Sequence, residues 1–124
     1  MSINLSEKAI IHFYRVHDLE KQRVFYQEFL GLSLYKNQGQ CLIIDLNEQA
    51  KIGFCTHHPR QTKDDACITF VFESLEELEA MQAHFKVHGV SCEAIHTNKS
   101  FNIIHFFARD PAEHLLEFQM FIES

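Results

Sequence analysis

The sequence predicts a single α+β domain (residues 1–124) built from two similar modules, each with the element order strand, helix and three strands. Module one spans about residues 8–56 and module two about residues 66–122, with a polar linker at 57–65. A constant offset of 56 residues, typical of an internal duplication, supports this division. The matched pairs are Leu19 with Leu75, Glu20 with Glu76, and Phe29 with Phe85. We expect two mixed sheets that form a half-open barrel with the helices outside and a cavity inside.

The first module opens with a strand rich in branched and aromatic residues, and a helix follows it. Asp18 is a suitable N-cap for this helix, and Gly31 is a suitable residue to end it. Turn-forming residues then separate three short strands. The predicted strands of this module are 9–16, 32–36, 41–46 and 51–55.

The second module repeats this order. Ser74 and Glu77 form a capping box at the start of its helix, and Gly89 follows the last helical turn. Pro111 separates the last two strands, because proline cannot donate to a β-ladder. The predicted strands of this module are 67–72, 90–95, 101–107 and 115–121.

The last predicted strand carries a carboxylate, Glu117, and an amide, Gln119, within an apolar run. Burying an isolated ionised carboxylate is costly, so such a group needs a partner. Alternation along a strand puts Glu117, Gln119 and Phe121 on one face and their apolar neighbours on the other. We expect this polar face to line the cavity, with Glu117 as a general base or as a group that accepts hydrogen bonds from a ligand.

Further residues are expected to contact a ligand beside Glu117. The guanidinium of Arg15 suits a carboxylate or phosphate of a ligand, although a pair with Glu117 or a surface ion pair is an equal alternative. His105 is a ligand-contacting group, a proton shuttle or a hydrogen-bonded core histidine. The expected ligand-contacting residues are Phe13, Arg15, Cys67, Thr69, His105, Phe107 and Gln119.

Composition excludes several classes of partner. The 11 Lys and Arg residues against 17 Asp and Glu give a formal charge of −6, with no basic stripe for nucleic acid. No apolar run approaches the roughly 20 residues of a membrane helix, and the first residues lack the pattern of a signal peptide. We therefore expect a cytoplasmic protein. The four cysteines have neither C-x-x-C nor zinc-like spacing, and we expect buried, reduced thiols.

Several segments spread over residues 9–121 carry a family resemblance. They are 15–20, 25–26, 30–32, 89–90 and 110–111, with Glu117 six residues after Pro111. In these segments the chain resembles the vicinal oxygen chelate superfamily of glyoxalases, bleomycin resistance proteins and extradiol dioxygenases. The resemblance implies a small-molecule ligand and a homodimer.

Metal-using members of this superfamily take one histidine or glutamate ligand from each of four strands. By resemblance, Glu117 matches the last of these positions. The other three positions fall on Ile11, near Gly53 and on Cys67, none of which suits a hard or borderline cation. The resemblance therefore implies a bleomycin-resistance-type protein that binds a small organic ligand in an aromatic-lined cavity without a metal.

The alternative is a glyoxalase-like lyase or isomerase, or a dioxygenase, that uses a divalent Zn, Ni, Mn or Fe ion. Its ligands are then His12, His105 and Glu117. His12 lies one residue from the family position, and a shift of one residue points a side chain to the opposite face of a regular strand. We expect His12 to lie under the helix layer as a satisfied histidine.

Overall fold

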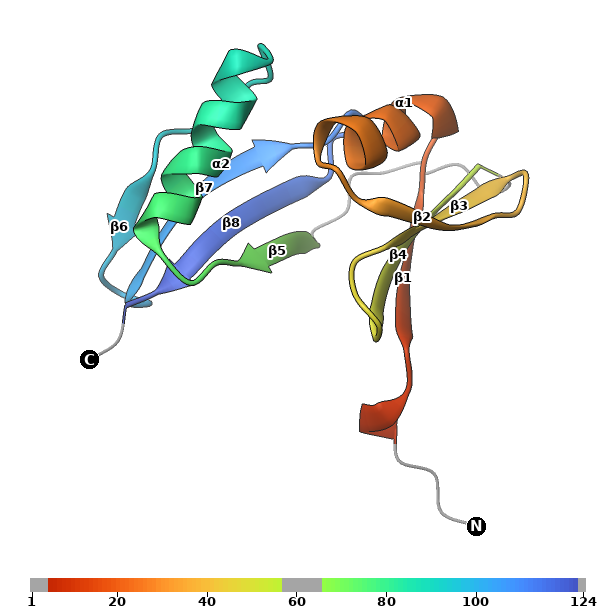
Figure 1. Ribbon diagram of the computed structural model, residues 1–124, viewed down its shortest axis with the longest axis horizontal. Coiled ribbons are helices and arrows are strands. Elements are labelled where there is room, and N and C mark those ends of the chain that lie inside the picture. The colour runs from red at the N-terminus through yellow and green to blue at the C-terminus, as the bar shows by residue number, and fades with distance from the viewer. Residues whose placement is uncertain (1–4, 57–65, 123–124) are drawn as a thin grey trace. The chain divides into compact units, whose positions relative to one another are not determined.

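A computed structural model describes residues 5–56 and 66–122, so the predicted linker 57–65 lies outside the described residues. The chain divides into two compact units, Met1–Lys63 and Asp64–Ser124. Each unit contains one four-stranded mixed sheet and the helix that follows its first strand (Figure 1). The predicted α+β class and the two repeated modules are confirmed.

The first unit has the strand order β1-β4-β3-β2. β1 runs parallel to β4, and the remaining neighbours are antiparallel. A short 3₁₀-helix, η1 (Leu5–Glu7), precedes β1. The other elements are β1 (Ile10–Arg15), α1 (Leu19–Arg23), a π-helical segment η2 (Val24–Phe29), β2 (Ser33–Asn37), β3 (Cys41–Asp45) and β4 (Ala50–Cys55).

The first helix begins and ends where the sequence predicts. The Asp18 carboxylate accepts a hydrogen bond from the backbone N–H of Lys21 at 3.1 Å, and Gly31 adopts the left-handed conformation (φ 76°) beyond the last turn. The middle differs, because Leu30 N–H donates to Phe25 O and thereby widens the last turns to π-helical spacing. Tyr26 from these turns packs on Phe54 of β4 with ring centroids 4.8 Å apart, which fixes the buried face of the sheet.

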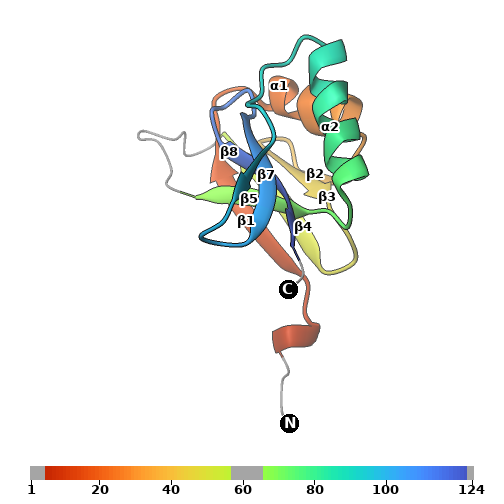
Figure 2. The same ribbon diagram turned by 90° about the vertical axis from the view of Figure 1, so that its left-hand side faces the viewer.

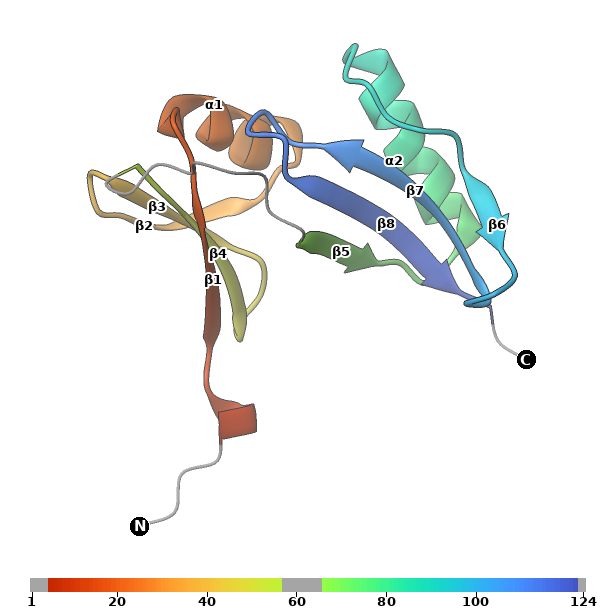
Figure 3. The same cartoon turned by 180° about the vertical axis from the view of Figure 1, so that it is seen from behind.

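The second unit has the strand order β5-β8-β7-β6 (Figure 3). β5 runs parallel to β8, and the other neighbours are antiparallel. Its elements are β5 (Cys67–Val71), α2 (Leu75–Val87), β6 (His96–Asn98), β7 (Ile103–Arg109) and β8 (Leu115–Phe121). A strand predicted at 90–95 is wrong: this segment makes only an isolated bridge between Cys92 and Ala108, and the edge strand begins at His96.

Helix α2 covers one side of this second sheet (Figure 2). The predicted capping box is present: Glu77 N–H donates to Ser74 Oγ at 3.2 Å, and Glu73 N–H donates to Glu77 Oε1 at 3.1 Å. Phe85 of the helix meets Phe118 of β8 edge-on, with ring centroids 5.5 Å apart. These aromatic contacts assign one face of β7 and β8 to the core and leave the alternate side chains on the opposite face.

The turn between β7 and β8 differs from a solvated loop. His114 in this turn is buried, and its Nδ1 lies 2.7 Å from Asp110 Oδ2. Asp110 Oδ1 also accepts the backbone N–H groups of Ala112 and His114, each at 2.9 Å. Glu113 adopts φ 71°, in the left-handed region that favours glycine.

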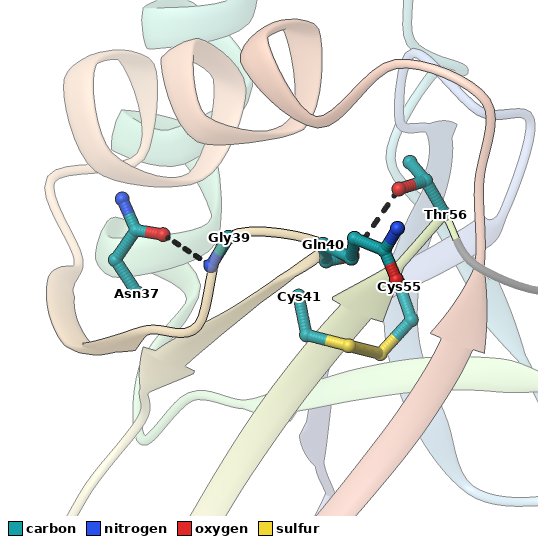
Figure 4. The surroundings of a disulfide bond; sticks show 6 residues. All are labelled: Asn37, Gly39, Gln40, Cys41, Cys55 and Thr56. Atoms are coloured by element: carbon teal, nitrogen blue, oxygen red, sulfur yellow. Dashed lines mark hydrogen bonds between the residues drawn. A yellow bond between two sulfur atoms is a disulfide. The ribbon is translucent and has the colours of Figure 1, made fainter.

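The prediction that all four cysteines are reduced and buried is wrong. Cys41 and Cys55 form a disulfide with their Cα atoms 4.2 Å apart (Figure 4). The β3–β4 hairpin pairs these two residues directly across the ladder, which brings their side chains together. At the same end of the hairpin, Thr56 Oγ donates to Gln40 O at 3.3 Å.

The two remaining cysteines are free thiols in the second unit. Cys67 is exposed at the start of β5, and Cys92 is half-buried. Neither therefore fits the expectation of a fully buried small hydrophobic residue.

No helix in the described part of the chain is long and apolar enough to span a membrane.

Candidate functional site

The face of the second sheet opposite α2 carries the polar side chains. Alternation assigns Glu117 and Gln119 of β8 to this face, because Leu116 and Phe118 of the same strand are buried on the helix side. The ladder pairs Glu117 with Thr69 of β5 on one side and with Phe107 of β7 on the other. Gln119 is paired with His105. Strand alternation thus brings together the predicted site residues of the second module.

Three donors converge on the Glu117 carboxylate. Thr69 Oγ donates to Oε1 at 2.8 Å, and Gln119 Nε2 donates to the same oxygen at 3.3 Å. On the other oxygen, Oε2, His105 Nδ1 lies at 2.6 Å. The Glu117 side chain retains 12% of its accessible surface, so these donors replace much of the water that an ionised carboxylate requires. The hydrogen-bond partners that a buried Glu117 carboxylate requires are therefore side chains of its own sheet.

His105 is the most buried polar residue of this face, with 4% of its surface exposed. Its ring lies between aromatic neighbours, 4.5 Å from the His96 centroid and 4.9 Å from the Phe107 centroid. Nδ1 faces Glu117, whereas Nε2 is buried without a hydrogen-bond partner among the described residues. The expected core histidine is therefore only half satisfied.

Cys67 extends this cluster along β5. Its Sγ lies 3.7 Å from Thr69 Oγ, which in turn donates to Glu117. Partial burial of the sulfur raises the pKa of the Cys67 thiol above its ordinary value; the hydrogen bond between Cys67 and Thr69 opposes this, the Glu117 charge raises the pKa further and Arg109 lowers it. Burial thus disfavours the reactive thiolate form of Cys67.

The cluster lies beside a hollow of about 440 Å³ on the open face of the sheet. Its wall combines aromatic and aliphatic side chains with a few polar groups, the composition usual for small-molecule sites. The lining residues are Asn98, Phe101, Ile103, His105, Phe107, Glu117, Gln119 and Phe121.

A larger hollow of about 640 Å³ lies towards the other end of β7, between the segment at 90–93 and the β7–β8 turn. Two of its charged side chains, Arg109 and Asp110, are engaged in the turn itself. Arg109 Nη1 donates to Glu113 O at 3.0 Å, and Asp110 holds the turn through His114. The smaller hollow is therefore the better candidate site, because its polar groups face a cavity rather than a turn.

Phe13 and Arg15 belong to the first unit, and their position relative to Glu117 stays a prediction. Both are exposed on β1, and the Phe13 ring lies over Gly53 of β4 so closely that a Cβ there would overlap it. This contact explains why glycine occupies a position where the superfamily resemblance places a metal ligand.

His12 does not lie in a covered layer. Tyr14, two residues along the same face of β1, contacts Phe54 at 6.2 Å between centroids, whereas His12 is exposed. The physical reason is length: η2 and the five residues of α1 cover the end of the sheet near Tyr14 and leave the start of β1 open.

A cluster of metal-ligating side chains is not found in the part of either unit that the structure describes. Among residues 5–56 and 66–122, no group of three or more His, Cys, Asp or Glu side chains is arranged to hold a metal ion. Glu117 Oε2 and His105 Nδ1 bind each other rather than pointing together at a third position.

The prediction of site residues misses five that line or flank the hollow. His96 stacks on His105 because it is the register partner of that residue on β6. It was missed because the edge strand begins at His96 and not at Val90. Phe121 shares the face of Glu117 by alternation, a signal that identifies the face but not the hollow. Asn98 ends β6, and Phe101 lies in the connection between β6 and β7. Ile103 begins β7 and shares the face of His105 by alternation.

Solved structures of low sequence identity have the same fold. Lactoylglutathione lyase from Agrobacterium tumefaciens is 16% identical, with a TM-score of 0.76 over 94% of this chain and 96% of the other. A glyoxalase/bleomycin resistance protein/dioxygenase from Nocardioides is 12% identical, with a TM-score of 0.78 over 100% and 88%. The genomically encoded fosfomycin resistance protein FosX from Listeria monocytogenes is 19% identical, with a TM-score of 0.74 over 97% and 94%.

A search of the curated proteins found no match. The family model described as Glyoxalase/Bleomycin resistance protein/Dioxygenase superfamily matches residues 9–118, nearly the whole of both modules. With the repeated modules and the shared fold, this match means that the chain belongs to the glyoxalase/bleomycin resistance protein/dioxygenase superfamily.

Proposed function

We propose that this protein binds a small organic ligand in the hollow of the second unit, beside Glu117. The observation that carries this proposal is the Glu117 carboxylate, held by three donors in the wall of an aromatic hollow. A carboxylate oxygen can accept more than one hydrogen bond, so Oε2 retains capacity for a ligand donor. Glu117 is also the group we propose as a general base, should the bound ligand react.

The shape and chemistry of the hollow support a small apolar ligand with few polar atoms. A volume of about 440 Å³ lies within the range of roughly 300–1,000 Å³ usual for such sites. Phe101 and Phe121 are largely exposed at this surface, which leaves apolar area for a ligand to cover. The names of two structural relatives, a lactoylglutathione lyase and a fosfomycin resistance protein, also refer to small organic molecules.

We propose further that binding does not require a divalent metal. Ile11 and Gly53 occupy two of the positions that the family resemblance assigns to metal ligands. At the third, the pKa of the Cys67 thiol is raised, which disfavours the thiolate that a metal needs. Elemental analysis after loading with Zn, Ni, Mn or Fe tests this proposal, and a stoichiometric ion that is lost in Glu117→Gln would overturn it.

The proposed site is tested by NMR with a panel of phenol, aniline, benzyl alcohol and benzoate. We expect backbone shift changes at Glu117, His105, Phe107 and Phe121 for at least one compound. Glu117→Gln should weaken that compound about tenfold, the effect of roughly 1.4 kcal/mol. Glu79→Gln, an exposed change on α2, is the matched control and should leave binding unchanged. Shift changes confined to other residues would refute the site.

We also propose a homodimer. β1 is an edge strand, and Ile10 and Phe13 on it are each 55% exposed, an arrangement that natural edge strands avoid unless they are covered. Light scattering coupled to gel filtration should give twice the mass of 14.5 kDa. Phe13→Lys should shift the mass toward the monomer, and a monomeric wild type would refute the proposal.

A further inference from the structure

His105 has one ring nitrogen engaged and the other buried without a partner among the described residues. Its Nδ1 lies 2.6 Å from Glu117 Oε2, and less than 5% of the residue is exposed. A buried polar atom without a hydrogen bond costs free energy, so native structures almost always supply a partner for it. His105 is one of the residues that line the hollow of about 440 Å³, so a ligand that enters the hollow and contacts this ring can supply that partner.

Glu117 determines which tautomer His105 adopts. The other oxygen, Oε1, already receives Thr69 Oγ and Gln119 Nε2, both acting as donors. An ionised carboxylate only accepts hydrogen bonds, so Nδ1 must carry the hydrogen in its contact with Oε2. A second hydrogen on Nε2 would be a buried donor without an acceptor. The favoured form therefore has Nδ1–H and a lone pair on Nε2.

We propose that His105 Nε2 accepts a hydrogen bond from the ligand, and that the ligand is a small aromatic or unsaturated molecule with an O–H or N–H donor. This inference rests on the proposed function and deepens it. Glu117 then acts as a positioning residue that holds the His105 ring and its tautomer. The rings of His96 and Phe107 flank His105 and limit its rotation, which keeps Nε2 in a fixed direction.

The first test measures the tautomer directly. Long-range ¹H–¹⁵N spectra of the imidazole distinguish a nitrogen with hydrogen from one with a lone pair. We expect Nδ1–H in the wild type at pH 7.5. In Glu117→Gln, we expect the amide oxygen to take the place of Oε1 and the amide NH₂ to face His105, so that Nδ1 becomes the acceptor and the hydrogen moves to Nε2. A wild type with hydrogen on Nε2, or with both nitrogens protonated, would overturn the inference.

The second test compares phenol with anisole, which has the same ring but a methyl ether in place of the donor. We expect phenol to bind the wild type about tenfold more tightly than anisole, because anisole leaves Nε2 unpaired. His105→Phe keeps an aromatic ring but removes the acceptor, and it should abolish the preference while anisole binding persists.

These results separate the two proposals. Equal affinity for phenol and anisole in the wild-type hollow would overturn the donor requirement and leave ligand binding intact. Absence of both compounds from the hollow would refute both proposals. The His105 tautomer of the wild type and the comparison of phenol with anisole test the inference even if Glu117→Gln fails to fold.

Discussion

Replacing Glu117 with glutamine should lower the free energy of unfolding by about 1–3 kcal/mol. The change keeps the size and shape of the side chain but removes the charge and one acceptor. Three donors face the native carboxylate, from Thr69, Gln119 and His105. Glutamine offers one acceptor oxygen and an NH₂ group, so it cannot match all three donors.

The size of this loss of stability depends on which ring nitrogen of His105 carries the hydrogen in the variant. If its hydrogen moves to Nε2, a charge-assisted bond of about 1.5–3 kcal/mol becomes a neutral bond of about 0.5–1.5 kcal/mol, a loss of about 1 kcal/mol. If the hydrogen stays on Nδ1, two donors face each other beside a side chain that is only 5% exposed. An unsatisfied buried donor costs about 1–3 kcal/mol, which sets the upper limit.

Urea denaturation followed by far-UV circular dichroism measures this loss, and a thermal scan should show a decrease of about 3–6 °C per kcal/mol for a chain of this size. Glu79→Gln on the exposed side of α2 is the control and should stay within about 0.5 kcal/mol of the wild type. A Glu117→Gln variant as stable as this control, or more stable, would refute the view that the carboxylate holds these donors together.

Three further predictions concern the rest of the chain. Reducing the Cys41–Cys55 disulfide should lower the free energy of unfolding by about 3 kcal/mol, as for other loops of about 15 residues. Peptide mapping without reductant should recover the cross-linked peptides, and alkylation of both thiols would contradict the disulfide. Gly53→Ala should destabilise by about 1 kcal/mol because its Cβ meets the Phe13 ring, and Phe13→Ala should remove that penalty in a double-mutant cycle. Alkylation of Cys67 by iodoacetamide should follow a pKa above the ordinary value of 9.0, because burial disfavours the thiolate. The glutamine variant described above should shift this pKa down by removing a negative charge, and an unchanged profile would contradict the proximity of that charge.

Periodicity and capping chemistry predict the elements of this fold well. The polar face of β8 follows from alternation around Glu117, and the same rule places His105 and Thr69 beside it. The caps at Asp18 and Ser74 form the hydrogen bonds that their side chains predict. These features depend on local sequence, which is why they can be predicted without contacts.

The parts that the sequence does not predict depend on register and on element length. The pairing of Cys41 with Cys55 requires the exact register of the β3–β4 hairpin. His12 is exposed because the first helix is too short to cover it, although its face on the strand is the one expected. His114 is buried because Asp110 holds its ring in the turn, a contact between residues that composition alone suggests are solvated.

The alternation of side chains along the strands does not determine the chemistry of the site. It places His105 near Glu117 but does not tell which ring nitrogen meets the carboxylate. That choice follows from atomic distances, and it changes His105 from a satisfied core residue into a group with an unused acceptor. An ion pair between Arg15 and Glu117 stays a prediction. In contrast, the hydrogen bonds from Thr69 and Gln119 to the Glu117 carboxylate are present in the structure.

A crystal structure of the protein with bound phenol tests the central claim most directly. The account predicts phenol in the hollow lined by Phe107 and Phe121, with its oxygen within hydrogen-bonding distance of His105 Nε2. Phenol bound only at a surface that shares no residue with this hollow would contradict the account.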